Sequence, residues 1–417
     1  MRFFVYKHYL VIGDEQLICR KFICLKDNNN QIHFTTFHKY VFSKKQNVRN
    51  ISNDGNNRFD FIVKFLNYIY FYKNISSITL IKIDNIKEYL NKYGMGQLPG
   101  DIQTRSKSTV EACINTIITF IENLIEDRSV NMLITKNELY FNQLVRNKQG
   151  KICSKKIPLF TVQYKDKEKQ IFRDMPNAAF ELLFSHIYIH HKDILMLVAL
   201  SAFAGLRPSE ACNVRREDSE LGPGLIFTYV RNKISKIEID LRSEKCLRSD
   251  LKSTGRIKKE RLATVPIFFT DAFVEVYDEY MKYLNGKKYE KKYGPLSLNI
   301  SGKAITYDSY YAKFRKIIKK EIVPLFLSND NPEVVNYGRL LCEYNISPHI
   351  FRHWYTVQLV LFGVDNVAEL MNARGDKNPQ SSLTYLQNKG ALMKQYEHVN
   401  NEVFDYFSWL ADKKYGE

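Results

Sequence analysis

The stretch SPHIFRHWYTVQLVLFGVDNVAELMNARGDKNPQSSLTY, residues 347–385, determines how the rest of the chain is interpreted. It begins with His349 and Arg352, which are three residues apart and therefore lie on one face of any helix they share. An apolar segment with helical spacing follows, then a Gly-Asp turn, and Tyr385 lies nine residues beyond Asp376. A histidine and an arginine one turn apart are usually only a helix surface, so this pattern alone is a weak signal.

A second arginine far upstream strengthens the signal. Arg207 stands in the segment GLRPSEA, just after the apolar run ILMLVALSAFAG. Two arginines, a histidine and a downstream tyrosine suit phosphodiester chemistry. Arginine can hold the non-bridging oxygens of a phosphate with two parallel hydrogen bonds. Histidine can transfer a proton near neutral pH, and a tyrosine oxygen can attack phosphorus.

In this order, the residues resemble three sequence boxes of the tyrosine recombinase (phage integrase) family. The first box, G-L-R-x-S-E, is matched by residues 205–210, and the second, P-H-x-x-R-H, by residues 348–353. The third, G-H-x(8)-Y, is matched by Gly375 and Tyr385. This box has one departure, because the chain carries Asp376 where the family usually has His or Trp. The resemblance covers the C-terminal half and, more loosely, the segment from about residue 59 to residue 140.

The resemblance implies transesterification of DNA without a metal ion or a cofactor. Tyr385 would attack the scissile phosphate and give a 3′-phosphotyrosine and a free 5′ hydroxyl. Arg207 and Arg352 would neutralise the charge that develops on the non-bridging oxygens, and His349 would act as the base for Tyr385. The phosphate bond energy would be kept in the covalent intermediate, so a 5′ hydroxyl could reseal the strand without ATP.

The catalytic lysine has two candidates. The family places this lysine in a β-hairpin, where a flexible ammonium can reach the leaving 5′ oxygen. Lys252, which leads into Ser-Thr-Gly, is the better match to the family pattern, and Lys258 is the alternative because it lies closer to the next strand. Upstream, Glu210 is expected to orient Arg207 or to cap a helix, a structural role.

Asp376 allows several interpretations. An ionised aspartate cannot donate the hydrogen bond that His or Trp would give to a phosphate. It can pair with Arg374 or Lys377, which we favour because both cations lie within two residues. It can also accept the tyrosine proton. A further alternative is that the chain has lost catalysis and only binds DNA.

The charge of the chain agrees with a nucleic-acid partner. Its 417 residues include 62 Lys and Arg against 45 Asp and Glu, a net charge of +17. Such an excess is typical of a protein that meets a polyanion, although a lysine-rich solvated surface gives the same number.

The longest apolar run, residues 194–205, is too short to span a bilayer, and no signal peptide is recognisable. Seven cysteines without a C-x-x-C pair favour reduced thiols. We therefore expect a cytoplasmic, nucleoid-associated protein with no membrane contact.

Two patterns contain candidate metal ligands. Four residues near the N-terminus have an approximate zinc-finger order: Cys19, Cys24, His33 and His38. The stretch between the two pairs is shorter than in a zinc finger, so these residues are better explained as parts of strands. The adjacent His190 and His191 are, by themselves, weak evidence for a metal site. The sequence therefore predicts no metal site.

The chain divides into four predicted segments. Residues 1–58 form a β-rich extension, which could be an arm-type DNA-binding module. Residues 59–145 have helical periodicity and resemble the core-binding DNA domain of integrases. Residues 146–174 are a basic linker. Residues 175–417 would be the catalytic domain, mostly helical with three strands between residues 225 and 267, and they end in a tail helix that packs on its own chain or on a neighbouring subunit.

The predicted fold class is therefore mainly α with a small β-sheet (α+β). The predicted function is a site-specific recombinase or integrase that cuts and rejoins double-stranded DNA as a homo-oligomer, a tetramer, to integrate or excise a mobile element. One alternative is a tyrosine-class type I topoisomerase, which shares the chemistry but reseals the same strand. The other is a catalytically degenerate DNA-binding protein.

Overall fold

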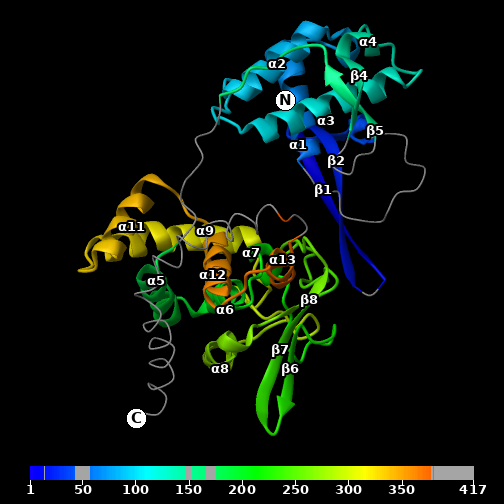
Figure 1. The fold of residues 1–417 in the computed structure, drawn as a ribbon. Coiled ribbons are helices and arrows are strands. Elements are labelled where there is room, and N and C mark those ends of the chain that lie inside the picture. Colours follow the sequence, from blue (N-terminus) through cyan, green and yellow to red (C-terminus); the bar gives the residue numbers. More distant parts are fainter. Residues whose placement is uncertain (14, 43–56, 147–151, 166–174, 377–378, 380–417) are drawn as a thin grey trace. The chain divides into compact units, whose positions relative to one another are not determined.

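The computed structural model describes residues 1–13, 15–42, 57–146, 152–165, 175–376 and 379. Within these ranges the chain is mainly helical with small antiparallel sheets, which confirms the predicted fold class (Figure 1). The predicted nucleophile Tyr385, the cation Lys377 and the predicted tail helix all lie outside the described residues. None of the described helices is both long enough and apolar enough to cross a membrane.

Contacts group the chain into two compact units, residues 1–10 with 18–169, and residues 11–17 with 170–417. The strands and helices that lie in the first unit or begin there have these bounds: β1 Arg2–Ile12, β2 Gln16–Lys26, β3 Ile32–Phe34, η1 Phe37–Tyr40, α1 Arg58–Asn67, η2 Tyr68–Tyr72, η3 Ile78–Leu80, α2 Ile83–Met95, α3 Lys107–Ile125, α4 Lys136–Leu139, β4 Tyr140–Arg146 and β5 Ile152–Pro158.

The first unit has one hydrophobic core, to which the predicted extension and the predicted helical segment both contribute. Phe3, Ile23 and Val41 are buried together with apolar residues of α1, α2 and α3. α2 ends at Gly96, whose positive φ of 69° stops the helix. β4 and β5 pair as an antiparallel hairpin, so part of the predicted linker is a strand of this unit. The functional roles expected for these segments stay predictions.

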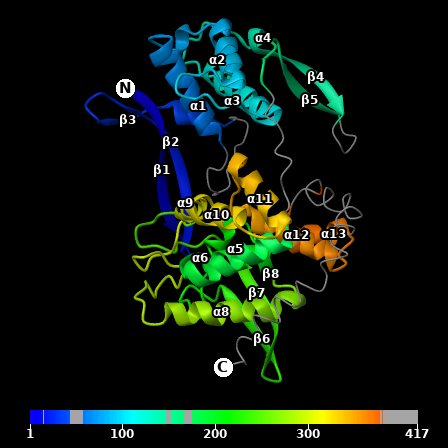
Figure 2. The same cartoon turned by 90° about the vertical axis from the view of Figure 1, so that its left-hand side faces the viewer.

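The second unit contains the predicted catalytic segment. Its helices and strands have these bounds: α5 Asn177–His190, α6 Lys192–Phe203, α7 Pro208–Ala211, β6 Leu225–Val230, β7 Lys233–Leu241, β8 Arg261–Thr264, η4 Ile267–Phe269, α8 Thr270–Leu284, α9 Tyr307–Ile317, η5 Ile318–Ile322, α10 Val323–Leu327, α11 Pro332–Glu343, α12 His349–Leu361 and α13 Val367–Arg374. Helix α6 is apolar on all sides, and α5, α8 and α12 pack against it (Figure 2). A helix with no polar face is stable in water only when it is covered in this way.

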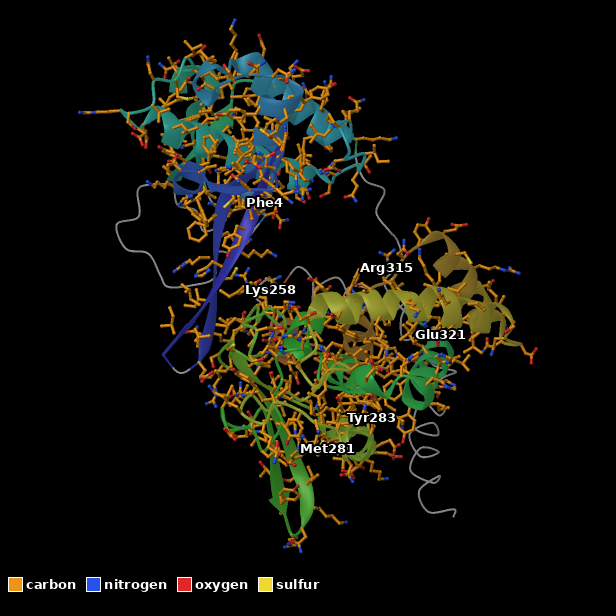
Figure 3. The ribbon with its side chains drawn as sticks, turned by 180° about the vertical axis from the view of Figure 1, so that it is seen from behind. Phe4, Lys258, Met281, Tyr283, Arg315 and Glu321 are labelled. Atoms are coloured by element: carbon orange, nitrogen blue, oxygen red, sulfur yellow. The ribbon has the colours of Figure 1, made fainter. Side chains whose placement is uncertain are left out.

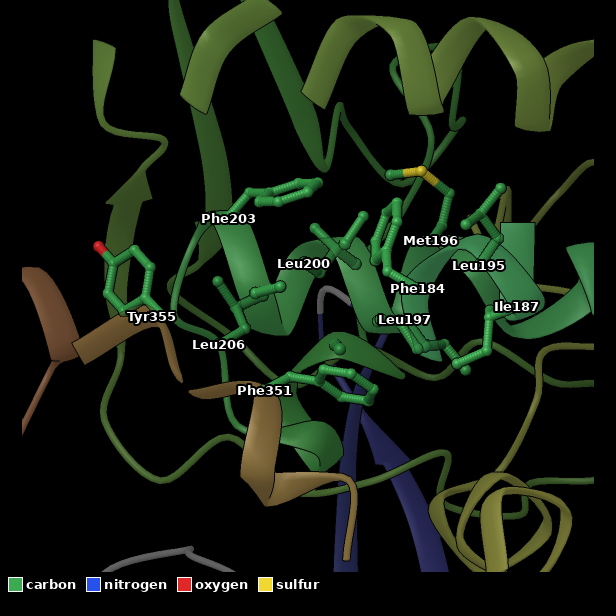
Figure 4. Close-up of a cluster of buried hydrophobic side chains, with 14 of the residues drawn as sticks. Phe184, Ile187, Leu195, Met196, Leu197, Leu200, Phe203, Leu206, Phe351 and Tyr355 are labelled. Carbon is green, nitrogen blue, oxygen red and sulfur yellow. The ribbon is translucent and has the colours of Figure 1, made fainter. Parts of the chain in front are cut away.

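The end of α6 is fixed by a close contact with α12. Gly205 has a positive φ of 64°, and a Cβ at this position would lie 2.3 Å from Cε1 of Tyr355. Only glycine fits there, because any side chain would collide with the ring and the backbone conformation would be strained. Figure 4 shows Leu206 and Tyr355 in this buried cluster, together with Phe351 of α12.

The three strands predicted between residues 225 and 267 are confirmed. They form an antiparallel sheet in the order β6-β7-β8, with Leu225 opposite Ile239 and Ile239 opposite Ala263. These three side chains are buried on the face that joins the main core of the second unit. Because strand side chains alternate between faces, Arg261 at the start of β8 shares the face of Ala263.

Candidate active site

Arg207 is placed by the turn between α6 and α7. It is the N-terminal capping residue of α7, and its backbone N–H donates to Oε2 of Glu210 at 3.2 Å. Its side-chain Nη1 donates to Oε1 of the same carboxylate at 2.8 Å. Glu210 therefore both caps the helix and orients Arg207, so the structural role expected for it is confirmed.

A second arginine shares the Glu210 carboxylate. Nη2 of Arg261 lies 3.0 Å from Oε2 of Glu210, and Glu210 is fully buried. Although burial raises the pKa of Glu210, the charges of Arg261 and Arg207 lower it below its ordinary value. Gly375 lies against Arg261, because a Cβ on this glycine would be 2.4 Å from Nε of Arg261.

Arg352 lies in the first turns of α12 and is buried against the end of α6. Its Nη1 donates to the carbonyl oxygen of Gly205, and its Nη2 donates to the carbonyl oxygen of Arg374 at 2.7 Å. Burial, reinforced by the charges of Arg207 and Arg374, lowers the pKa of Arg352 to about 9. The guanidinium therefore stays charged at neutral pH, and two backbone carbonyls fix its direction.

Asp376 joins these arginines. Helix α13 ends at Gly375, which has a positive φ of 63° and turns the chain back. Oδ1 of Asp376 then accepts hydrogen bonds from Nη2 of Arg207 at 2.6 Å and from Nη2 of Arg352 at 2.8 Å. Oδ2 accepts from Nε of Arg374 at 2.8 Å.

The pairing of Asp376 with Arg374, predicted from their proximity in the sequence, is confirmed. The sequence did not indicate that the same carboxylate would lie between Arg207 and Arg352. Asp376 has not turned away from the site; it occupies the position between the two arginines that were predicted to hold a phosphate.

The cluster as described carries an excess of positive charge. Among the described residues, four guanidiniums meet two carboxylates, those of Glu210 and Asp376: the guanidiniums are those of Arg207, Arg261, Arg352 and Arg374. In addition, the buried Nε of Arg261 has no hydrogen-bond partner among the described residues. An arrangement with two surplus positive charges and an unused donor is suited to binding an anion.

His349 is the first residue of α12 and is half-buried beside the cluster. Burial, together with the charges of Arg352 and Arg374, lowers the pKa of His349 to about 4. The imidazole is therefore neutral at pH 7 and has a free lone pair that can accept a proton. Its ring centroid lies 5.0 Å from that of His353 in an edge-to-face arrangement.

The two candidate lysines have different surroundings. The backbone N–H of Lys258 donates to Oε1 of Glu210 at 3.3 Å, so this lysine is anchored beside the carboxylate that orients Arg207. The backbone N–H of Lys252 donates to Oδ1 of Asp250 at 3.2 Å. Both side chains are exposed, and Figure 3 labels Lys258.

The structure thus brings together Arg207, Arg352, Asp376 and His349 from the predicted site, with Lys258 at its edge. Sequence reasoning missed Arg261. A signal was available, since residues 261, 263 and 265 alternate onto one strand face and the last two are apolar. A charged residue at an inward position of a strand requires a partner, and Glu210 is that partner.

The N-terminal cysteine and histidine pattern has a simpler explanation. Cys19 and Cys24 lie in β2, and His33 lies in β3, so the interpretation of these three as strand residues is confirmed. For His38 that interpretation is wrong, because this residue lies in the short helix η1, after β3 has ended. Nε2 of His33 lies 2.9 Å from Oδ2 of Asp27.

No family model matches the chain, and no curated protein matches its sequence. Among solved structures, it is similar to the XerH site-specific recombinase bound to difH substrate, with 14% identity and a TM-score of 0.44 over 79% of this chain and 74% of that chain. It is also similar to the Tn1549 transposon integrase in complex with circular intermediate DNA, with 16% identity and a TM-score of 0.46 over 80% and 90%. A third is a lambda integrase dimer bound to a COC′ core site, with 11% identity and a TM-score of 0.39 over 82% and 90%. All three TM-scores lie below 0.5, and we therefore infer the function from the residues of this chain.

Proposed function

We propose that this chain is a tyrosine-type site-specific DNA recombinase that cuts and rejoins double-stranded DNA through a 3′-phosphotyrosine. One observation carries the proposal: Arg207 and Arg352 direct their Nη2 atoms at a single carboxylate oxygen, that of Asp376, at 2.6 and 2.8 Å. A carboxylate oxygen held by two guanidiniums accepts the same kind of charge-assisted hydrogen bonds as a non-bridging oxygen of a phosphodiester. The arginine pair is thus already arranged to hold such an oxygen.

DNA would bind by exchange of anions. The scissile phosphate would take the place of Oδ1 of Asp376, while Oδ2 could keep its bond to Arg374. The surplus charge of the cluster supports this exchange, because Arg207 and Arg352 would gain a phosphate while Glu210 still holds Arg207 in position.

The chemical step would be a transesterification at phosphorus. The oxygen of Tyr385 forms a bond to phosphorus, its proton passes to His349, and the bond from phosphorus to the 5′ oxygen breaks. The incoming phosphate brings negative charge next to His349 and so raises its pKa from about 4 towards the ordinary value, which makes it a better base. The arginines stabilise the charge on the equatorial oxygens.

For the leaving 5′ oxygen, we propose Lys258 as the proton donor, with Lys252 as the alternative. Lys258 is favoured by its anchor on Glu210. The 5′ hydroxyl of a partner strand would then attack the phosphotyrosine and return the proton. We further propose that the protein acts as a homo-oligomer, a tetramer, on the ends of a mobile element.

The test uses the full-length chain and a nicked duplex that carries the DNA ends flanking its gene, so that the cut fragment diffuses away. We expect a covalent protein–DNA adduct that resists detergent and is absent with Tyr385→Phe, which removes only the nucleophilic oxygen. Tyr396→Phe is the matched control and should form adduct normally. Adduct formation by Tyr385→Phe would overturn the assignment of the nucleophile.

The same experiment separates the other functions. Exchange of strands between two duplexes distinguishes a recombinase from a type I topoisomerase, which reseals the strand that it cut. A DNA-binding protein without catalysis is the second candidate, and the position of Asp376 between the two arginines favours it. If the wild-type chain binds its site and forms no adduct, this second candidate replaces the first.

A further inference from the structure

A second cluster of titratable side chains lies at the junction of α5 and α6, separate from the arginine cluster. His186 is in the last turns of α5, and His191 is the residue between the two helices. Nε2 of His186 and Nε2 of His191 lie 2.8 and 2.7 Å from the same atom, Oε2 of Glu321. The acidic partner of His191 is thus a residue 130 positions away in the sequence.

Two irregularities of the backbone bring these side chains together. Glu321 lies in η5, a π-helical turn that continues α9 (Figure 3). A π-turn contains more residues than an α-turn, so it directs Glu321 differently from a continued α-helix, and such turns are frequent at functional sites. His191 has φ −133° and ψ 51°, which breaks the helix between α5 and α6.

We propose that His186, His191 and Glu321 form a binding site for a divalent transition-metal ion of the zinc class. Their three ligand atoms lie within 4.8 Å of one another. Two imidazole nitrogens and one carboxylate oxygen are ligands that such ions prefer, whereas Mg²⁺ and Ca²⁺ prefer oxygen ligands alone.

The distances allow an ion to enter with small movements. Ligand bonds of about 2.0–2.2 Å in a tetrahedral site place neighbouring ligand atoms roughly 3.3–3.6 Å apart. The nitrogen-to-oxygen distances of 2.7 and 2.8 Å therefore need to open by about 0.5–0.9 Å. Each imidazole would bind through Nε2 and carry its proton on Nδ1.

Access from solvent is open. The side chains of His186, His191 and Glu321 are 18%, 16% and 34% exposed. An ion can therefore reach all three, and water can fill the fourth position. Since Glu321 is 135 residues from His186, a bound ion would link distant parts of the second unit and stabilise its fold.

The test is made with the full-length chain after treatment with a chelator, with Zn²⁺ alone as the probe and no DNA present. We expect one Zn²⁺ per chain by calorimetric titration. At a free Zn²⁺ concentration 100 times the dissociation constant, the melting temperature should rise by about 5 °C or more. Mg²⁺ should give neither effect.

Variants of the three residues locate the ion. His186→Ala and His191→Ala should each weaken Zn²⁺ binding by more than about 100-fold. Loss of a residue that only hydrogen-bonds a metal ligand costs at most about 100-fold in affinity, and loss of a ligand itself should cost more. Glu321→Gln preserves the size of the side chain and removes only the charge, and it should weaken binding about tenfold or more. His190→Ala is the matched control, because its exposed ring lies next to that of His186 and is not among the three ligands.

Circular dichroism of each metal-free variant shows whether the protein is still folded, and so distinguishes loss of the metal site from loss of the fold. If a histidine variant is unfolded, Glu321→Gln tests the site in its place. Binding that stays unchanged in His186→Ala and His191→Ala would place the ion elsewhere, at the thiols for example, and overturn the proposal. So would a wild-type chain that binds no Zn²⁺. Neither result depends on DNA cleavage, so it leaves the proposed recombinase function untouched.

Discussion

Glu210 and Asp376 are both carboxylates surrounded by arginines, yet the structure holds them in different ways. Glu210 is fully buried on α7 and accepts hydrogen bonds from two guanidiniums and from the backbone amides of Arg207 and Lys258. Asp376 follows the last turn of α13, and the hydrogen bonds to its carboxylate described above all come from guanidiniums.

This difference suggests different roles for the two carboxylates. Glu210 would hold Arg207 in place, whereas a phosphate could replace the carboxylate of Asp376. The backbone amide of Arg207 cannot move away from Glu210 without disrupting the start of α7, so this carboxylate is a fixed part of the site. The guanidiniums around Asp376 would donate equally well to a phosphate oxygen. Charge changes at the two positions should therefore have opposite effects on phosphate binding, and the following variants test this.

The largest effect is expected from Glu210→Gln. Removing the charge of the fully buried Glu210 leaves the partly buried Arg261 and Arg207 without their shared ionic partner. Breaking a buried ion pair in this way costs about 3–5 kcal/mol of folding free energy. Denaturant unfolding measures the loss, and cleavage should fall with it because Arg207 is no longer oriented. Glu220→Gln, at an exposed carboxylate of the same region, is the control and should be neutral. A stable and active Glu210→Gln would remove the distinction between the two carboxylates.

Next come Arg207→Ala and Arg352→Ala. Each removes one donor from the phosphate oxygen, which should lower the single-turnover rate of adduct formation by about 10²–10³. Lysine at either position should rescue poorly, since a point charge cannot reproduce the fork of a guanidinium. Arg231→Ala, on an exposed turn, should cleave like the wild type. Near-normal cleavage by Arg207→Ala would exclude the arginine cluster as the active site.

The two lysines should differ by about 10² in cleavage. Lys258→Ala removes the proposed donor to the leaving oxygen and should slow adduct formation by that factor, while Lys252→Ala changes it little. A DNA substrate whose 5′ oxygen is replaced by sulfur needs no proton on leaving, so it should restore cleavage by Lys258→Ala. If Lys252→Ala shows the defect and the rescue instead, the assignment moves to Lys252.

The smallest expected effect has the opposite sign. Asp376→Asn removes the competing anion, so binding of the DNA site should tighten by about tenfold, a gain of about 1.4 kcal/mol, while the unliganded chain loses stability because Arg352 and Arg374 lose their partner. Equilibrium binding and thermal unfolding measure the two changes. Asp365→Asn, at an exposed carboxylate, should change neither.

Cleavage by Asp376 variants distinguishes its roles. A collapse of cleavage in Asp376→Asn with binding unchanged would show that the carboxylate transfers the tyrosine proton. If only Asp376→His forms adduct and the wild type does not, the wild-type chain is a DNA-binding protein without catalysis.

The sequence predicted those parts of the site that depend on short spacings. His349 and Arg352 share a helix turn, Arg207 follows a buried helix, and Asp376 pairs with Arg374 two residues away. The three strands of the second unit were also predictable, because alternation of apolar residues is a local pattern.

Contacts between distant segments could not be predicted in this way. The bond between Arg207 and Asp376 joins residues 169 positions apart, and Glu321 meets two histidines more than 100 residues upstream. Such partners depend on how helices that are far apart in the sequence pack, and a single sequence contains no local signal for that packing. For the same reason, the sequence did not indicate that Phe3 would be buried with α1.

If the chain binds DNA as proposed, the carboxylate of Asp376 changes how the affinity depends on salt concentration. Each phosphate that a protein neutralises releases condensed cations from DNA, and the logarithm of affinity falls with the logarithm of salt concentration by about 0.9 per phosphate. A free chloride displaced from an arginine would leave for the bulk, but Asp376 is covalently attached and stays beside the arriving phosphate. It therefore cancels one of the positive charges that the site offers. The salt dependence of binding should then understate the number of phosphates in contact, and Asp376→Asn should steepen it by about 0.9.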